Sequence, residues 1–150
     1  MGEVLFYHLQ DMRLEQVLPA LLEKSLERGW RVVVEAGSAE RVEALDAHLW
    51  TYRDDSFLPH GCAGERDSTD MPIVLTSESD NPNGAQVRFL IEGASLPADD
   101  ASYERLVLIF DGDDDVALAR AREAWSEAKR RDLAATYWQP DAQGRWQRKA

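Results

Sequence analysis

Two carboxylates and an imidazole lie within one short aromatic stretch, LWTYRDDSFLPHG, which spans residues 49–61. Asp54, Asp55 and His60 are residue types that general acid–base catalysis uses. In an extended segment, however, adjacent aspartates point to opposite sides, which argues against a paired-carboxylate active site. Cys62 follows His60 by two residues, but a thiolate–imidazole pair requires contact in the fold rather than proximity in the sequence. The stretch therefore predicts no catalytic residues.

The same stretch is rich in side chains that anchor protein interfaces. Tryptophan, tyrosine and phenylalanine are enriched at the centres of interfaces, and an irregular segment exposes them more readily than a helix does. Two interpretations are open for Trp50, Tyr52 and Phe57. They form a contact surface for a partner, or they close one end of the protein's own core.

The phosphate-binding loops of nucleotide enzymes are missing from the sequence. A dinucleotide site needs a glycine-rich turn after the first strand, but LQDMRLEQ (9–16) contains no glycine and EAGSAER (35–41) contains only Gly37. No glycine is followed by lysine, which excludes a P-loop. The acidic run FDGDDD (110–115) could hold a hard metal ion, but acidic residues also cap and stabilise helix N-termini. The second interpretation is favoured, so we expect no metal and no cofactor.

The charge of the chain is unevenly distributed. The formal net charge is −11, which argues against binding of DNA by the whole surface. Residues 116–150 contain eight basic and four acidic side chains and thus carry +4, whereas the first 115 residues carry −15. This contrast indicates either a local site for an anionic partner or a solvated helix face.

The length and composition are typical of one soluble domain. With 150 residues and 44% hydrophobic residues, the chain can bury a substantial core as a single domain, 1–150. The lone cysteine, Cys62, cannot form an internal disulfide, which fits the reducing cytoplasm. No apolar run approaches the roughly 20 residues that a membrane helix needs, so we expect a cytoplasmic protein with no membrane contact.

Apolar runs of strand length alternate with segments of helical periodicity along the chain. This alternation predicts an α/β fold with a mostly parallel sheet, helices on both faces and a C-terminal edge hairpin. Residues 51–71 show no regular period. The expected strands span residues 3–9, 30–37, 72–77, 87–93 and 103–112, the helices 13–29, 39–50 and 113–132, and the hairpin 134–150.

Four segments resemble the chi subunit family of bacterial DNA polymerase III, especially its alphaproteobacterial branch. The central and final segments are the most distinctive, and together the four extend over essentially the whole chain. They are FYHL, LDAHLWTYRDDSFLPHGCAGE, NPNGAQVRFLIEG with VLIFDG, and TYWQPDAQGRWQRKA.

The resemblance implies a mononucleotide-binding-like fold that binds no nucleotide and has no activity of its own. It implies an accessory subunit of a nucleotidyltransferase complex that joins the clamp loader to single-stranded DNA-binding protein, so that DNA is contacted only indirectly. The clamp-loader contact is made through a small psi subunit, or directly. The other contact is to the acidic C-terminal tail of single-stranded DNA-binding protein, which ends in an aromatic residue and a free carboxylate.

The resemblance also implies two sets of contact residues. The region that contacts psi or the clamp loader matches Trp50, Tyr52, Phe57, Leu58, Pro59 and His60. The tail-binding patch matches the last long helix, at Arg122, Trp125, Lys129 and Arg130. Lys129 stands where better-known members have arginine, so a tail carboxylate would meet a point charge there rather than a bidentate fork.

Two other functions are open on the residues alone. An α/β enzyme that handles a nucleotide or another small molecule would need a deep pocket with convergent polar groups at the carboxyl ends of the strands. A general adaptor of the same fold would bind a different acidic partner.

Overall fold

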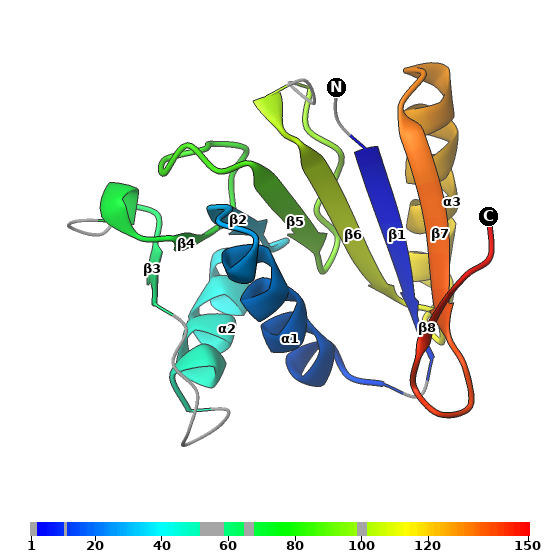
Figure 1. The fold of residues 1–150 in the computed structure, drawn as a ribbon, viewed down its shortest axis with the longest axis horizontal. Helices are drawn as coiled ribbons and strands as arrows, with labels where there is room; N and C mark the ends of the chain where they lie inside the picture. Colours follow the sequence, from blue (N-terminus) through cyan, green and yellow to red (C-terminus); the bar gives the residue numbers. More distant parts are fainter. Residues whose placement is uncertain (1–2, 11, 52–58, 65–67, 99–101) are drawn as a thin grey trace.

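A computed structural model describes residues 3–10, 12–51, 59–64, 68–98 and 102–150. Its core is an eight-stranded sheet with the order β3-β4-β2-β5-β6-β1-β7-β8 (Figure 1). All neighbouring strands are parallel except β7 and β8, which form the antiparallel C-terminal hairpin at one edge. The α/β fold and the edge hairpin predicted from the sequence are confirmed. The strands are β1 (Glu3–Leu9), β2 (Val32–Glu35), β3 (His60–Cys62), β4 (Ile73–Thr76), β5 (Val87–Ile91), β6 (Arg105–Asp111), β7 (Ala134–Pro140) and β8 (Trp146–Arg148).

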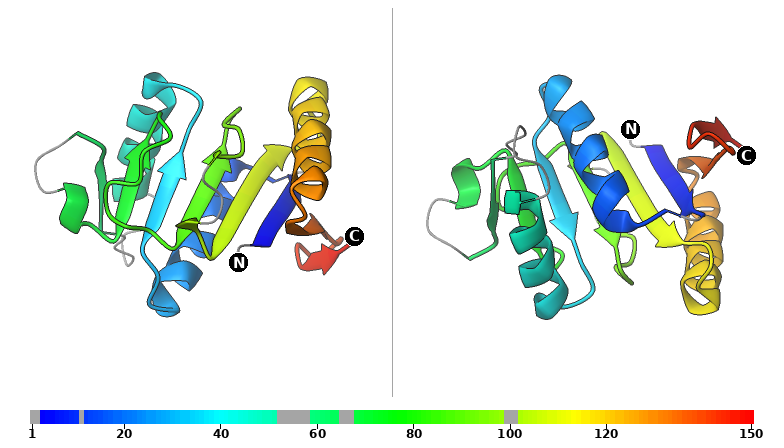
Figure 2. Two further views of the ribbon diagram at one scale, coloured as in Figure 1. Left: turned by 90° about the horizontal axis from the view of Figure 1, so that it is seen from above. Right: turned by 90° about the horizontal axis from the view of Figure 1, so that it is seen from below.

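Among the described residues, three α-helices cover the two faces of the sheet. The helices α1 (Leu14–Glu27) and α2 (Ala39–Thr51) lie on one face, and α3 (Asp115–Arg130) lies on the other (Figures 1 and 2). Each face has its own hydrophobic cluster, because alternate residues of the buried strands point to opposite sides. Val32 and Val34 pack under α1 and α2, whereas Val33 faces the α3 side. No helix within the described ranges is both long enough and apolar enough to cross a membrane.

The helix boundaries follow local signals that the sequence contains. Ser38 Oγ accepts a hydrogen bond from the Arg41 backbone N–H at the start of α2. Asp114 Oδ1 accepts from the N–H groups of Val116 and Ala117 and so caps α3. Gly29 follows α1 with a φ of 79°, a conformation that favours glycine at a helix C-terminus. The acidic run before α3 therefore acts as a cap, as its position predicts.

One strand was not predicted from the sequence. Residues 51–71 contain the three-residue strand β3, which pairs with β4, and a 3₁₀ turn, η1 (Ser68–Asp70). A three-residue strand at a sheet edge is too short to produce a readable period of alternation. β3 therefore depends on its pairing with Ile73–Leu75 of β4 rather than on local propensity.

The crossover from β4 to β5 contains no helix and is held by a buried arginine. Arg88 of β5 is fully buried and donates to the backbone carbonyls of Glu78 and Asp80, at 2.6 and 2.7 Å. Its guanidinium also contacts the carboxylate of Glu35 on β2, at 3.1 Å from Nε and 2.5 Å from Nη2, and Tyr103 Oη at 3.2 Å. In a helical crossover, the backbone carbonyls would accept from N–H groups of the same helix. In this loop, Arg88 donates to two of those carbonyls instead.

Candidate functional site

The face of α3 that meets β1 and β7 is aromatic. Ala121 and Ala128 are buried where α3 packs against the sheet. Trp125 lies between them in the sequence and is half-buried. The Trp125 ring makes edge contacts with Phe6 of β1, at 5.3 Å between centroids, and with Tyr137 of β7, at 6.0 Å. Phe6 and Tyr137 are register partners in the parallel pair of β1 and β7, which places both under the same turn of α3.

Two cations flank this aromatic group. Lys129 Nζ lies 4.8 Å from the centroid of the Trp125 ring, a cation–π contact. Arg122 precedes Trp125 by three residues on α3 and so lies on the same side of the helix. Burial raises the pKa of Tyr137, and the positive charge of Arg122 opposes that rise. The structure therefore brings together Arg122, Trp125 and Lys129, as their predicted spacing on one helix face requires. These three residues and Tyr137 are called the α3 surface below.

Arg130 lies on a different side of the helix. It is five residues beyond Trp125, which corresponds to roughly 140° around the helix axis. Its Nη2 donates to Glu127 Oε1 at 2.5 Å, and Arg131 Nε donates to the other oxygen of Glu127 at 2.8 Å. These hydrogen bonds, first from Arg130 and then from Arg131, lower the pKa of Glu127. Arg130 is thus already paired and faces away from Trp125.

His8 extends the α3 surface toward the carboxyl ends of the strands. Its Nδ1 lies 2.6 Å from Tyr137 Oη, and its ring packs against Phe110 at 5.1 Å. A Cβ added to Gly112 would come within 1.8 Å of His8 Nε2, so glycine is needed there for the imidazole to lie against the backbone. Burial lowers the pKa of His8 despite the nearby charges of Asp113 and Asp111. Burial thus favours the neutral imidazole, whose hydrogen bond with Tyr137 extends the polar part of this surface.

The Trp50 region lies at the opposite edge of the sheet. Trp50 at the end of α2 is 48% exposed, and its ring lies 4.3 Å from that of His60, which is only 1% exposed. His60 Nε2 contacts Asp46 Oδ1 at 3.0 Å, which fixes the imidazole against α2. Pro59 is half-buried beside it. Trp50 and Pro59 are called the Trp50 surface below. His60, expected among the contact residues, is buried beneath the Trp50 ring and supports that ring rather than facing a partner. Tyr52, Phe57 and Leu58 lie outside the described residues.

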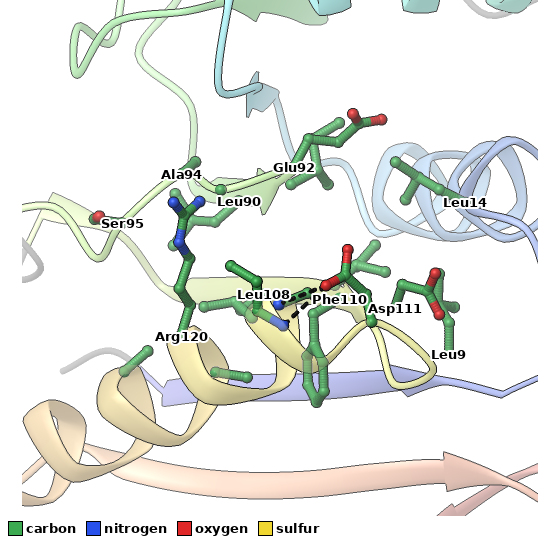
Figure 3. Close-up of a pocket in the computed structure, with 18 of the residues that line it drawn as sticks. Leu9, Leu14, Leu90, Glu92, Ala94, Ser95, Leu108, Phe110, Asp111 and Arg120 are labelled. Atoms are coloured by element: carbon green, nitrogen blue, oxygen red, sulfur yellow. Dashed lines mark hydrogen bonds between the residues drawn. The ribbon is translucent and has the colours of Figure 1, made fainter.

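A groove of about 1470 Å³ lies where an enzyme of this fold would bind its ligand, at the carboxyl ends of β5, β6 and β1. Three of the acidic groups that line it contact the protein itself, and the Arg120 side chain also extends into it (Figure 3). Asp114 caps α3, Asp111 Oδ1 accepts from the Asp113 N–H at 2.9 Å, and Glu92 accepts from Arg41 Nη2 at 2.5 Å. The N-terminus of α3, where a phosphate would bind, is thus occupied by a carboxylate.

This geometry predicts that the protein does not bind ATP or NAD. The Asp114 carboxylate accepts from two of the N–H groups at the start of α3, those of Val116 and Ala117, and its negative charge would repel a phosphate. Isothermal titration calorimetry with either nucleotide should show no saturable heat. Micromolar binding of either one would contradict the prediction and restore the enzyme hypothesis.

Two residues that matter in these surfaces were not identified from the sequence. The sequence pattern places Tyr137 in the C-terminal hairpin and His8 on the first strand, and it indicates no contact between them. The parallel pairing of β1 with β7 brings Tyr137 into the α3 surface and His8 beside it, and that pairing joins residues more than 125 positions apart. The signal available in the sequence was the aromatic pair Tyr137-Trp138 within a strand, whose two side chains must face opposite sides of the sheet.

A comparison with protein families finds a match over most of the chain. The family described as "DNA polymerase III chi subunit, HolC" matches residues 1–136. A "Probable DNA polymerase III subunit chi" from Rickettsia prowazekii, an alphaproteobacterium, is 28% identical over 96 residues, which are 64% of this chain and 58% of the relative. The "DNA polymerase III subunit chi" of Pseudomonas aeruginosa is 32% identical over 60 residues, 40% of this chain and 41% of the relative. The matched regions thus span about half the length of these two curated relatives.

Proposed function

Because the chain belongs to the DNA polymerase III chi subunit family, we propose that it is a non-catalytic accessory subunit in DNA replication. In this role it links the clamp loader to the acidic C-terminal tail of single-stranded DNA-binding protein. The α3 surface binds the tail, and the Trp50 surface binds the psi subunit or the clamp loader directly.

The α3 surface is the observation that carries the proposal. A peptide that ends in an aromatic residue and a free carboxylate needs an apolar contact beside fixed positive charges. Trp125 and Tyr137 supply half-buried rings, and Lys129 Nζ lies 4.8 Å from the Trp125 ring centroid. Hydrogen bonds to a carboxylate from charged donors are the stronger kind. The surface lies in the part of the chain that carries +4 within an otherwise acidic protein, so attraction of the tail is local.

The positions of the two surfaces suit a linking role. The Trp50 surface lies beside β3 at one edge of the sheet, and the α3 surface lies over β1 and β7 near the other edge. Six strand spacings separate β3 from β7, which amounts to roughly 30 Å. Two partners can therefore occupy the surfaces at the same time without overlap.

Titration of a synthetic tail peptide into the purified protein tests the proposal. The peptide contains the last residues of single-stranded DNA-binding protein, including the terminal carboxylate. We expect saturable binding that weakens as the salt concentration rises. A peptide with an amidated C-terminus should bind much more weakly, because it lacks the terminal charge. Equal binding of the two peptides, or no binding of either, would contradict the proposal.

Replacement of Trp50 by alanine is expected to weaken binding to the clamp loader by at least about 1 kcal/mol, the loss that marks an energetically important interface residue. Trp50 is 48% exposed although its ring rests on His60, so a partner can cover it without rearrangement of the fold. Surface plasmon resonance with immobilised clamp loader, with and without psi, measures the loss. Val116→Ala is a suitable control, because Val116 is also an exposed apolar residue, at 62%, but lies on α3. An equal affinity of Trp50→Ala and wild type would exclude Trp50 from the contact.

A further inference from the structure

The α1 face of β1, β7 and β8 has no helix above it among the described elements. In Figures 1 and 2, α1 lies over the central strands, while α3 covers β1 and β7 from the other side. The side chains on this open face are largely aromatic. Tyr7 of β1 lies 6.3 Å from Trp138 of β7 in a stacked arrangement and 4.7 Å from Trp146 of β8 in an edge arrangement. All three rings are half-buried, so each retains some exposed surface.

Arginines lie beside a fourth ring, that of Trp30. Arg28 and Arg105 lie 5.0 and 5.1 Å from the centroid of the Trp30 ring. Both also act on Tyr7: burial raises the pKa of its phenol, while the charges of Arg105 and Arg28 oppose the rise. Arg148 is the register partner of Trp138 in the hairpin. The Tyr7, Trp138 and Trp146 rings at the hairpin and the Trp30 ring with its two arginines lie on the same side of the sheet, and the charges of Arg28 and Arg105 act on Tyr7. The two groups together are called the sheet platform: Tyr7, Arg28, Trp30, Arg105, Trp138, Trp146 and Arg148.

The sheet platform and the α3 surface are on opposite faces of β7. Tyr137 points toward α3, and Trp138 points away from it, because successive strand residues alternate. A ligand on the platform would therefore leave the α3 surface and the Trp50 surface accessible. The platform is thus a site additional to the two in the proposed function, and it does not depend on them.

We propose that the sheet platform binds a short single strand of nucleic acid, with bases stacked on Trp138 and Trp146 and phosphates held by Arg28, Arg105 and Arg148. Partly exposed rings on an open sheet face, with cations at their margins, provide both of the interactions that single strands need. Glu3 pairs with Arg105, at 2.6 Å from Nη2, and so reduces the local charge by one. The net charge of −11 argues against nucleic-acid binding by the whole surface. At physiological salt, however, screening limits the reach of each charge to roughly 8 Å, so distant acidic residues repel a strand on the platform only weakly. Binding is therefore weak, local and sensitive to salt.

Fluorescence anisotropy with a labelled oligothymidine of about ten nucleotides, in about 50 mM salt, tests the proposal. Wild type should bind saturably, and the affinity should fall as salt is raised. Trp146→Ala and Arg28→Glu should each weaken binding about fivefold or more, whereas Trp146→Phe should retain most of it because the ring remains. Arg120→Glu changes the charge by the same amount as Arg28→Glu, but it lies on α3 on the other face, and it should bind like wild type.

A second probe separates stacking from charge. An oligonucleotide of the same length with abasic sites presents the phosphates without bases and should bind much more weakly than oligothymidine. Equal binding of the two would overturn the stacking on Trp138 and Trp146. Absence of saturable binding by wild type, or tighter binding of a polyglutamate peptide than of oligothymidine, would overturn the proposal, and the latter would identify an acidic protein as the occupant instead.

Discussion

Replacement of Arg88 by methionine is expected to lower the free energy of unfolding by about 3–5 kcal/mol, the usual cost of removing one partner from a buried ion pair. The change would leave the Glu35 carboxylate without its counter-charge and two loop carbonyls, of Glu78 and Asp80, without their donor. Urea unfolding followed by circular dichroism measures the loss. The transition should remain cooperative, because both hydrophobic clusters retain their members.

Two further variants make this result interpretable. Arg41→Met removes an arginine that pairs with Glu92 at the surface, with 46% of the arginine side chain exposed, and should cost less than about 1 kcal/mol. The double variant Arg88→Met, Glu35→Leu should be more stable than Arg88→Met alone, because it removes the uncompensated carboxylate. A loss for Arg88→Met no larger than that for Arg41→Met would show that the crossover loop does not need the buried arginine.

Reversal of charge at Lys129 is expected to weaken binding of the tail peptide by about 1–3 kcal/mol, the range for loss of a charge-assisted contact. Lys129 Nζ is held over the Trp125 ring, where it can meet a carboxylate whose aromatic neighbour packs on the same ring. The fold should tolerate the change, since Lys129 is exposed. Isothermal titration calorimetry with wild type and Lys129→Glu measures the difference.

The neighbouring residue provides the matched control. Arg130→Glu alters the net charge by the same amount one residue further on, but Arg130 pairs with Glu127 and points away from Trp125. We therefore expect a smaller effect than for Lys129→Glu. If the two variants lose the same affinity, the tail responds only to overall charge, and the α3 surface is not a defined site.

The sequence predicted the parts of the fold that depend on local patterns. Residues 30–37 were expected to form a strand, and the three valines within that range, Val32, Val33 and Val34, are all buried in β2. The acidic residues before α3 predicted its start, and Asp114 caps it. Such features can be predicted from the sequence because each depends on residues that lie within a few positions of one another.

Features that depend on long-range pairing were not readable. β3 exists through its pairing with β4, and the α3 surface depends on the pairing of β1 with β7. Arg88 stands between the apolar residues Val87 and Phe89, a pattern that predicts an arginine on the exposed face of a half-buried strand. In the structure, Arg88 is fully buried. Its burial is possible only because Glu35 and the loop carbonyls surround it. The residues Arg122, Trp125 and Lys129 could be grouped beforehand because helical spacing alone brings them to one face.

The most direct test of the linking role is assembly of a three-part complex. Clamp loader with psi, where present, is mixed with this protein and with single-stranded DNA-binding protein, and the particle mass is measured by sedimentation velocity. Wild type should give one particle that contains all three components. Trp50→Ala should reduce retention of the clamp loader but keep single-stranded DNA-binding protein, and Lys129→Glu should do the reverse. If the two partners compete for wild type, so that no particle contains both, the proposed linking function is wrong.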